Sequence, residues 1–452
     1  MTRGSDAPGD GPVGGADPLS SEIVATSDVK ADGPRMQFQT PKGMHDIVWP
    51  ESSRWEQLVA RFAALVEGAA YGLAITPVLE HVGIFNRGIG EGSDVVGKEM
   101  YTFADRDGQI MALRPEGTAS IVRSYVQHHP IPPWKAWYAA PSFRHENPQK
   151  GRYRQHFQLG VEALGPSDAD LDVEVVSMAF DFIASLGLHQ VTLKLNSMGD
   201  ENCRPEYIEL LRVFFAERRP ELCLSHRQRF EENPLRVLDC KTPECESASE
   251  NAPRFIDHLC EPCSTHFARV RAGLDALDVP YTIDHRLVRG FDYYTRTTFE
   301  FASGAIDAAQ NALGGGGRYN GLVEMLGGPP TPGIGFGLGV ERILIACDAE
   351  GVFPIEAPPL HAYVIDLTGG ESAVLLTAEL RRAGFRVDRG FDDRSMKSQM
   401  KTADRSGALV ALVIGPKELA EGTVSLKQLR NEEEQRTVGR ADIVAELGAL
   451  LL

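Results

Sequence analysis

The sequence predicts an α+β protein built on a largely antiparallel sheet, with a helical insertion and a separate α/β domain at its C-terminal end. Three observations lead to this fold class. Strand-like runs between residues 100 and 196 follow one another with few helices between them, which favours antiparallel pairing. Residues 199–283 are helical, charged and rich in cysteine, and strand-like segments resume after them. From residue 361 strand and helix patterns alternate, as in a small α/β domain.

The composition is that of an ordinary soluble protein of several domains. The chain has 452 residues, 42% of them hydrophobic and 24% charged, and no apolar run approaches the roughly 18 residues needed to cross a bilayer. Its formal charge of −17 argues against nonspecific coating of nucleic acid, although a local basic groove remains compatible with an acidic body. We therefore expect no membrane role, and any RNA contact should be focused.

Residues 1–36 form a predicted disordered tail. They are rich in Gly, Pro, Asp and Ser and show no apolar periodicity, so they cannot bury enough surface to offset their chain entropy. Acidic residues such as Asp6, Asp10 and Asp17 distinguish this tail from a transit peptide, and it lacks the apolar core of a secretory signal. The expected location is the cytoplasm.

The first domain begins with a helix over residues 53–70, where apolar residues recur on one helical face. Strand-like runs bounded by Gly, Pro or Asp follow it. The predicted strands are 100–103, 109–114, 135–140, 155–164 and 191–196.

The second half of the chain completes that domain and adds another. A strand-like segment from residue 291 leads through a glycine run at 314–317 to a strand that enters an apolar helix near residue 340. Prolines near 354–359 mark a linker. The expected organisation is one domain of residues 37–198 and 284–352, an insertion of 199–283, and a terminal domain of 360–452.

A basic hairpin between residues 143 and 164 carries the most informative pattern. Its loop holds Lys150, Arg152 and Arg154, and arginine presents a fixed fork of donors to phosphate oxygens. Arg144 and Glu146 alternate with His145, so on a strand they share one face. The alternative is a charged hairpin that is simply solvated.

Two further segments place arginines beside glycines. Arg289 precedes Tyr293 and Tyr294, which on a strand point to opposite faces, so that one lines a pocket while the other packs. Arg342 follows the glycine-punctuated strand at the start of a helix. That segment lacks the βαβ unit and the later acidic residue of a dinucleotide-binding fingerprint. Tyrosines in a core and glycines in a plain loop are the alternatives.

Together these segments resemble the bacterial type of histidyl-tRNA synthetase, a class II aminoacyl-tRNA synthetase family. KGMHDIVWP from Lys42 is similar to the family's first motif, FRHE from Phe143 to the second and GLGVER from Gly337 to the third. RPEGT from Arg114 and LVRGFDYY from Leu287 are similar to the histidine-specific blocks. The resemblance implies a class II catalytic domain, a homodimer and a C-terminal anticodon-binding domain.

The resemblance also implies a reaction: ligation of L-histidine to tRNA(His) through a histidyl adenylate, with ATP and Mg²⁺ as the substrate complex. The carboxylate of histidine is already ionised and attacks the α-phosphate, so the site must stabilise negative charge and needs no general base. The implied catalytic residues are Arg144 at the α-phosphate and the carboxylate, Arg342 at the γ-phosphate and Arg289 at the α-phosphate. Glu146 is implied on the ATP side.

Matching positions imply the contacts with histidine and RNA. A small ligand with an ammonium group and two ring nitrogens requires acceptors for the first and a donor and acceptor for the second. The implied histidine-binding residues are Glu116, Gly117, Thr118 and Gln158 near the ammonium, and Glu162, Tyr293 and Tyr294 near the imidazole. The loop with Lys150, Arg152 and Arg154 is implied to meet the acceptor end of tRNA.

The insertion carries two cysteine pairs, C-x4-C and C-x2-C. Four thiolates in two close pairs suit tetrahedral zinc, so Cys240, Cys245, Cys260 and Cys263 form a candidate Zn²⁺ site. His258 and His266 are nearby alternative ligands, and buried free cysteines are the alternative to a metal site.

Two other functions compete with the synthetase. A noncatalytic relative would act as a regulatory subunit or sensor, but such proteins typically lose the catalytic arginines, the histidine blocks or the terminal domain, all of which are present here. A class II synthetase for another amino acid is disfavoured by the RGFDYY block.

Overall fold

An eight-stranded sheet forms the centre of the first structural region. The computed structural model describes residues 38–90, 95–288, 293–306, 311–356, 358–391, 394–431 and 433–451, so the predicted tail lies outside the described residues. The order of the strands is β1-β5-β6-β11-β10-β9-β7-β8. The strands are β1 (Gly72–Leu73), β5 (Trp134–Phe143), β6 (Gln155–Leu164), β7 (Val191–Ser197), β8 (Thr282–Ile283), β9 (Thr295–Ser303), β10 (Ala312–Arg318) and β11 (Gly333–Gly339).

The predicted antiparallel arrangement is confirmed for the body of this sheet. The pairs from β5 through β6, β11, β10 and β9 to β7 are all antiparallel, and only the short edge strands β1 and β8 pair in parallel. Glycines let β10 and β11 approach closely, because a Cβ on Gly316 would lie 1.9 Å from the carbonyl oxygen of Gly335. The glycine run therefore serves strand packing.

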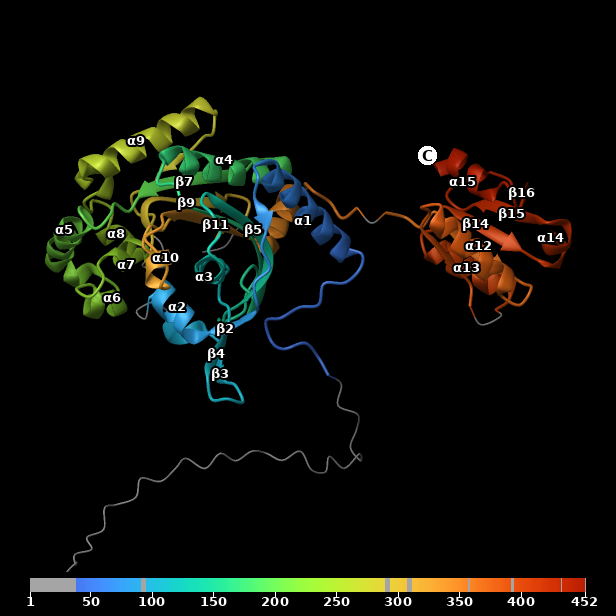
Figure 1. The fold of residues 1–452 in the computed structure, drawn as a ribbon, viewed down its shortest axis with the longest axis horizontal. Coiled ribbons are helices and arrows are strands. Elements are labelled where there is room, and N and C mark those ends of the chain that lie inside the picture. Colours follow the sequence, from blue (N-terminus) through green and yellow to red (C-terminus); the bar gives the residue numbers. More distant parts are fainter. Residues whose placement is uncertain are drawn as a thin grey trace, which may run out of the picture. The chain divides into compact units, whose positions relative to one another are not determined.

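Helices cover both faces of the sheet. On one face α1 (Glu51–Gly68), α4 (Ala169–Ser185), α9 (Glu261–Ala276) and α11 (Val340–Glu350) share a continuous apolar core with the strands. Leu58, Phe62 and Val66 form the buried stripe of α1, at the helical spacing that the sequence predicts. Figure 1 shows α3 (Thr118–His128) on the concave side of the sheet and α4 and α9 outside it.

A buried ion pair ties these layers together. Arg318 at the end of β10 donates to the carboxylate of Asp172 on α4, and both side chains are fully buried. His266 on α9 contacts the same carboxylate, with 2.8 Å between Nε2 and Oδ2. The lowered pKa of Asp172 results from the hydrogen bonds and charges of His266 and Arg318, which outweigh burial.

A second, smaller sheet lies against helix α2 (Val82–Ile89). Its order is β2-β4-β3, and both pairings are antiparallel. The strands are β2 (Leu79–His81), β3 (Thr102–Ala104) and β4 (Ile110–Leu113).

Residues 204–276 contain helices and no strands, and every one of these residues is described. Besides α9 they include α5 (Arg204–Glu217), α6 (Leu224–Arg229), α7 (Leu235–Leu238) and α8 (Pro243–Ala248). The cluster that α5 to α8 bury is separate from the main core and includes Tyr207, Leu211, Phe215, Cys245 and Phe255. This is the helical character expected for the insertion.

Residues 362–451 build an α/β unit with a core of its own. Its sheet has the order β13-β12-β14-β15-β16, parallel among the first three strands and antiparallel among the last three. Its elements are β12 (Ala362–Asp366), α12 (Glu371–Arg382), β13 (Val387–Arg389), α13 (Met396–Arg405), β14 (Val410–Ile414), α14 (Pro416–Glu421), β15 (Thr423–Gln428), β16 (Arg436–Gly439) and α15 (Ile443–Leu451). In the described part of the chain, no helix is long and apolar enough to span a membrane.

Candidate active site

The hairpin of β5 and β6 carries Arg144 at the point where its loop begins. The loop closes on itself, since the amide of Arg144 donates to the carbonyl of Arg154 at 2.8 Å and Gln149 pairs with Arg152 around a turn. Gly151 in this turn has a φ of +76°, a conformation that favours glycine. The amide of Arg154 donates to the carbonyl of Gly43, which anchors the loop to the segment before α1.

A cavity of about 120 Å³ opens between this hairpin, β11 and the start of α11. Arg144, Arg152 and Arg342 line it together with Glu146 and Gln158. Arg342 is held by two carbonyls: its Nε donates to Gly151 and its Nη1 to Ala312, each at 2.8 Å. The structure thus brings together five of the residues implied for ATP, histidine or RNA.

Positive charge dominates this cavity. Burial lowers the pKa of Arg342, and the neighbouring cations Arg144 and Arg152 lower it further. Burial likewise lowers the pKa of Arg144. His156 also lines the cavity, and burial together with Arg144 and Arg342 lowers its pKa to about 3, so it is neutral at physiological pH. Because these cations share one cavity and repel one another, the cavity favours a polyanion such as a triphosphate.

Glu146 limits the excess of positive charge and positions the loop. Its carboxylate forms an ion pair with Arg152, whose Nη2 also lies 3.9 Å from Glu99. The guanidinium of Arg154 donates to the carbonyl of Glu146 at 3.1 Å. Lys150 is exposed at the tip of the loop. Of the three basic residues predicted for RNA, Arg152 therefore lines the cavity, whereas Lys150 faces outward.

A buried polar cluster lies on the concave side of the sheet. The hydroxyl of Thr118 donates to Glu162 at 2.6 Å, and the hydroxyl of Tyr319 donates to its other oxygen. Glu116 accepts from the amides of Thr118 and Ala119 at 2.6 and 2.8 Å, at the start of α3. Burial raises the pKa of Glu116, and it raises that of fully buried Glu162 to about 8. Two carboxyl groups buried together provide the acceptors that an ammonium and an imidazole require.

Two glycines are required by close contacts in this cluster. A Cβ on Gly117 would lie 2.5 Å from the ring of Tyr138, and one on Gly335 would lie 1.9 Å from the carboxylate of Glu162. Gly117 therefore lets the start of α3 rest against Tyr138. Gln158 lies nearby and accepts from the hydroxyl of Ser142 at 3.0 Å.

Tyr293 and Tyr294 do not point to opposite faces of a strand, and that prediction is wrong. They precede β9, so strand alternation does not apply to them, and their ring centroids lie 4.6 Å apart. Tyr293 is buried and packs edge-on against Tyr319 at 5.8 Å. Tyr319 in turn donates to Glu162, which connects this pair to the buried polar cluster.

Arg289, the third predicted catalytic residue, lies outside the described residues. Sequence reasoning missed His156, Tyr138 and Tyr319. His156 and Tyr138 lie on β6 and β5, where alternation could have revealed them, because β6 contributes Gln158 and Glu162 to the same side. Tyr319 follows Arg318 in a stretch that carried no such signal.

The four cysteines predicted to form one zinc site belong instead to two groups. Cys240 and Cys245 lie with Cys223 and His226, whereas Cys260 and Cys263 lie with Asp200 and Cys203. The prediction combined the two pairs because they are close in sequence. In the fold the first pair meets the start of α6, whereas the second meets the segment just before α5. His266 bonds to Asp172, and His258 lies against the ring of Tyr207, so neither alternative ligand belongs to these groups.

Comparison with known proteins gives consistent matches over most of the chain. The family model for histidyl-tRNA synthetase matches residues 43–199 and 242–343, and the model for an anticodon binding domain matches residues 361–450. A histidine–tRNA ligase of Rhodococcus erythropolis is 47% identical over 422 residues, 92% of this chain and 98% of the relative. One from an Anaeromyxobacter species is 46% identical, covering 88% of this chain and 97% of the relative. The apo histidyl-tRNA synthetase of S. aureus has a TM-score of 0.76 at 35% identity, over 91% of this chain and all of that one.

Proposed function

This chain belongs to the histidyl-tRNA synthetase family, and on that premise we propose which role each of its residues has in the reaction of that family. The protein is an aminoacyl-tRNA synthetase that ligates L-histidine to tRNA(His), with ATP consumed and AMP and pyrophosphate released. The antiparallel sheet with its separate α/β unit is the fold of that family. The observation that carries the assignment of roles is the convergence of Arg144, Arg152 and Arg342 on one cavity.

The activation step uses cations and no base. A carboxylate oxygen of histidine forms a bond to the α-phosphorus while the bond to the pyrophosphate oxygen breaks, and no proton moves. Arg144 binds the α-phosphate and the attacking carboxylate, Arg289 stabilises the charge that develops at the α-phosphate, and Arg342 binds the γ-phosphate. Glu146 orients this site through its ion pair with Arg152. Mg²⁺ enters with ATP as part of the substrate complex.

Histidine binds over the buried carboxyl groups. Glu116, Thr118 and Gln158 receive the α-ammonium, and Gly117 keeps the start of α3 against Tyr138. Glu162 and Tyr294 recognise the imidazole, and Tyr293 packs beside them. An analogue without ring nitrogens would make no hydrogen bond to the fully buried carboxyl group of Glu162, which opposes its binding without any editing step.

The proposal also assigns the domains and the residues that contact tRNA. Residues 37–198 and 284–352 form the catalytic domain, 199–283 an inserted domain and 360–452 the anticodon-binding domain. The family model skips residues 200–241, which supports the insertion, and the match at 361–450 supports the terminal domain. Lys150, Arg152 and Arg154 receive the acceptor end of tRNA, and exposed Lys150 is the residue of this loop that reaches outward.

The protein acts in the cytoplasm as a homodimer. Support for the dimer is a set of exposed apolar side chains, two of them in the first motif, since exposed apolar surface marks interfaces. Val48, Trp49, Leu73 and Ile75 are exposed, and Ile75 is 86% exposed. Sedimentation should show a dimer for the wild type and a shift toward monomer for Ile75→Glu; a monomeric wild type would contradict this part of the proposal.

The proposal also includes zinc in the inserted domain, held by cysteines that include Cys240, Cys245, Cys260 and Cys263. Its support is the gathering of thiols, an imidazole and a carboxylate in that segment.

Histidine-dependent exchange of pyrophosphate into ATP tests the assignment of roles, because it isolates activation from RNA. Arg144→Ala should lower the exchange rate by about 10²- to 10³-fold, the effect of losing one oriented charge-stabilising donor. Arg382→Ala, at an exposed position on α12, is the control and should exchange like the wild type. Exchange that is undiminished in Arg144→Ala would refute its role, and exchange with another amino acid would refute the assigned histidine contacts.

A further inference from the structure

Two groups of metal-binding side chains lie in the inserted helical segment, apart from the cation-lined cavity. The first group contains Cys223, His226, Cys240 and Cys245. In each group the four candidate ligand atoms lie within 4.8 Å of one another.

The second group contains Asp200, Cys203, Cys260 and Cys263. All seven cysteines of the chain lie in its described part, and none of them forms a disulfide. Each group has three thiols, so pairing two of them as a disulfide would leave one over. A single tetrahedral cation, in contrast, uses every member of a group.

The separations in the first group match the edges of a zinc tetrahedron. With Zn–S near 2.3 Å and Zn–N near 2.0 Å, a tetrahedral angle places sulfur and nitrogen about 3.5 Å apart. Nδ1 of His226 lies 3.3 Å from Sγ of Cys223 and 3.7 Å from Sγ of Cys245. One ring nitrogen therefore stands at the required distance from two sulfurs at once.

The second group fits the same geometry with oxygen in place of nitrogen. A Zn–O bond of about 2.1 Å gives a sulfur–oxygen edge of about 3.6 Å. Oδ1 of Asp200 lies 3.7 Å from Sγ of Cys203 and 3.7 Å from Sγ of Cys260. The other carboxylate oxygen lies 3.4 Å from Nη2 of Arg296, an outer contact of the kind that orients a carboxylate ligand.

Each group joins two short sequence pairs from distant parts of the insertion. The first combines a C-x2-H pair at 223–226 with the C-x4-C pair at 240–245. The second combines a D-x2-C pair at 200–203 with the C-x2-C pair at 260–263. Paired spacings of this length are typical of structural zinc sites, whose four ligands close around the ion.

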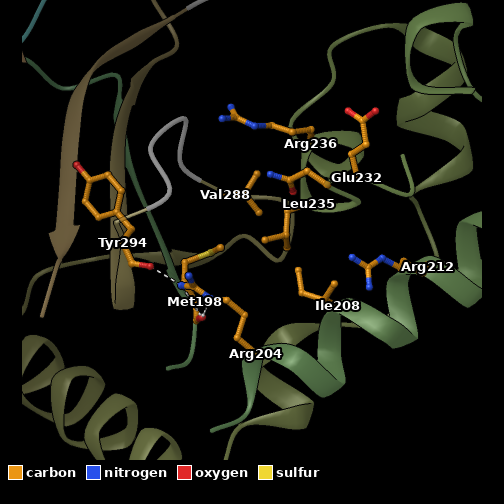
Figure 2. Close-up of a pocket in the computed structure, with 10 residues that line it drawn as sticks. Met198, Arg204, Ile208, Arg212, Glu232, Leu235, Arg236, Val288 and Tyr294 are labelled. Atoms are coloured by element: carbon orange, nitrogen blue, oxygen red, sulfur yellow. Dashed lines mark hydrogen bonds between the residues drawn. The ribbon is translucent and has the colours of Figure 1, made fainter. Parts of the chain in front are cut away.

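The second group is connected to the tyrosine pair beside the proposed histidine site. Cys203 is the residue before α5, and Arg204, the first residue of that helix, donates to the carbonyls of Met198 and Tyr294. Figure 2 shows these contacts at the edge of a cavity of about 250 Å³, which also borders Leu235.

Part of the lining of this cavity comes from segments next to the two groups. Arg204 and Ile208 on α5 follow Cys203, and Leu235 lies between the two ligand pairs of the first group. An ion in the second group fixes the start of α5 and, through Arg204, the backbone at Tyr294.

We propose that the insertion binds two structural zinc ions, one by Cys223, His226, Cys240 and Cys245 and one by Asp200, Cys203, Cys260 and Cys263. This deepens the zinc binding proposed above by assigning four further ligands and a second ion. It does not depend on the roles of the catalytic arginines. The second ion also positions the segment that carries Tyr294.

Metal content of the purified full-length chain tests this assignment. The wild type should contain two zinc ions per chain, and Cys240→Ser and Cys260→Ser should each contain one. Cys347→Ala, a buried cysteine of α11 outside both groups, is the control and should keep two. A wild type with no zinc or one ion per chain would overturn the proposal, and so would retention of both ions in either cysteine variant.

Cobalt substitution keeps the test decisive if a variant fails to fold. Chelator-treated wild type should take up two equivalents of Co²⁺, with thiolate-to-metal charge-transfer bands that grow to the second equivalent. Saturation at one equivalent, or binding without these bands, would overturn the proposal. X-ray absorption at the zinc edge should give an average of three sulfur ligands and one nitrogen or oxygen ligand per ion, and fewer sulfurs would contradict the assignment. Pyrophosphate exchange on the same sample separates a failure here from a failure of the proposed catalytic roles.

Discussion

Replacing Glu162 by glutamine should remove a pH dependence from the stability of the proposed catalytic domain. Burial raises the pKa of this carboxyl group from 4.5 to about 8. Between these two values the folded protein holds a proton that the unfolded chain has lost, so the free energy of unfolding falls as pH rises. The contribution of this bound proton to the free energy of unfolding is fully present below pH 4.5 and is lost as pH rises through about 8.

The magnitude follows from the difference between the two pKa values. At about 1.4 kcal/mol for each pH unit, the whole interval from 4.5 to about 8 corresponds to on the order of 5 kcal/mol. Between pH 6 and pH 9 the remaining part covers about two pH units, or about 3 kcal/mol. Glutamine has the shape of the protonated carboxyl group and does not titrate. Glu162→Gln should therefore gain about 3 kcal/mol relative to the wild type over this range.

Urea unfolding followed by tryptophan fluorescence measures this difference. The four tryptophans, Trp49, Trp55, Trp134 and Trp137, all lie in the proposed catalytic domain, so their signal reports its unfolding and not that of the terminal unit. Glu217→Gln is the matched control, because that side chain is 72% exposed. If the stability curves of the wild type and Glu162→Gln ran parallel from pH 6 to pH 9, the reasoning from burial would be refuted.

Three further changes test other parts of the structure. Gly117→Ala should lower kcat/KM for histidine by tenfold or more, since the new Cβ would lie 2.5 Å from the ring of Tyr138 and must displace the start of α3; pyrophosphate exchange measures this. Arg318→Met should cost about 3 to 5 kcal/mol of stability in urea unfolding, because it leaves Asp172 buried without its guanidinium partner. Cys260→Ser should raise the KM for histidine several-fold with little change in the KM for ATP, because the lost ion no longer fixes the segment at Tyr294; steady-state exchange kinetics separate the two constants.

Each of these variants has a matched control. Gly97→Ala adds a Cβ with no atom within 4 Å and should leave kcat/KM unchanged. Arg269→Met breaks an exposed pair with Asp170 and should cost less than about 1 kcal/mol. Cys223→Ser removes a ligand of the other ion, and its histidine KM should change less than that of Cys260→Ser. Equal effects of a variant and its control would contradict the corresponding explanation.

Much of the candidate site could be predicted from sequence because its residues lie in regular, local patterns. Strand β6 was predicted with the bounds that the structure has, and its alternation places Gln158 and Glu162 on one side. Arg144 and Arg342 stand at the ends of well-marked strands, and the structure brings both to one cavity. The buried face of α1 follows directly from its helical spacing.

Other features could not be predicted because they depend on contacts between distant segments. The rings of Tyr293 and Tyr294 lie together because the chain turns before β9, whereas alternation had assumed that the strand began earlier. The RNA contact predicted for Arg152 stays a prediction, but its ion pair with Glu146 at the cavity depends on how the loop folds and could not be predicted from spacing.

The sequence by itself determined the fold class, the arginines that line the cavity and the presence of candidate metal-ligand pairs in the insertion. Only the tertiary structure decided how those pairs combine: Cys240 and Cys245 meet Cys223 and His226, whereas Cys260 and Cys263 meet Asp200. It also decided the protonation of Glu162, whose pKa is raised by burial under β11 and not by any neighbour along the chain. Spacing along a chain reports local geometry, but ligand sets and desolvation depend on which segments fold against one another.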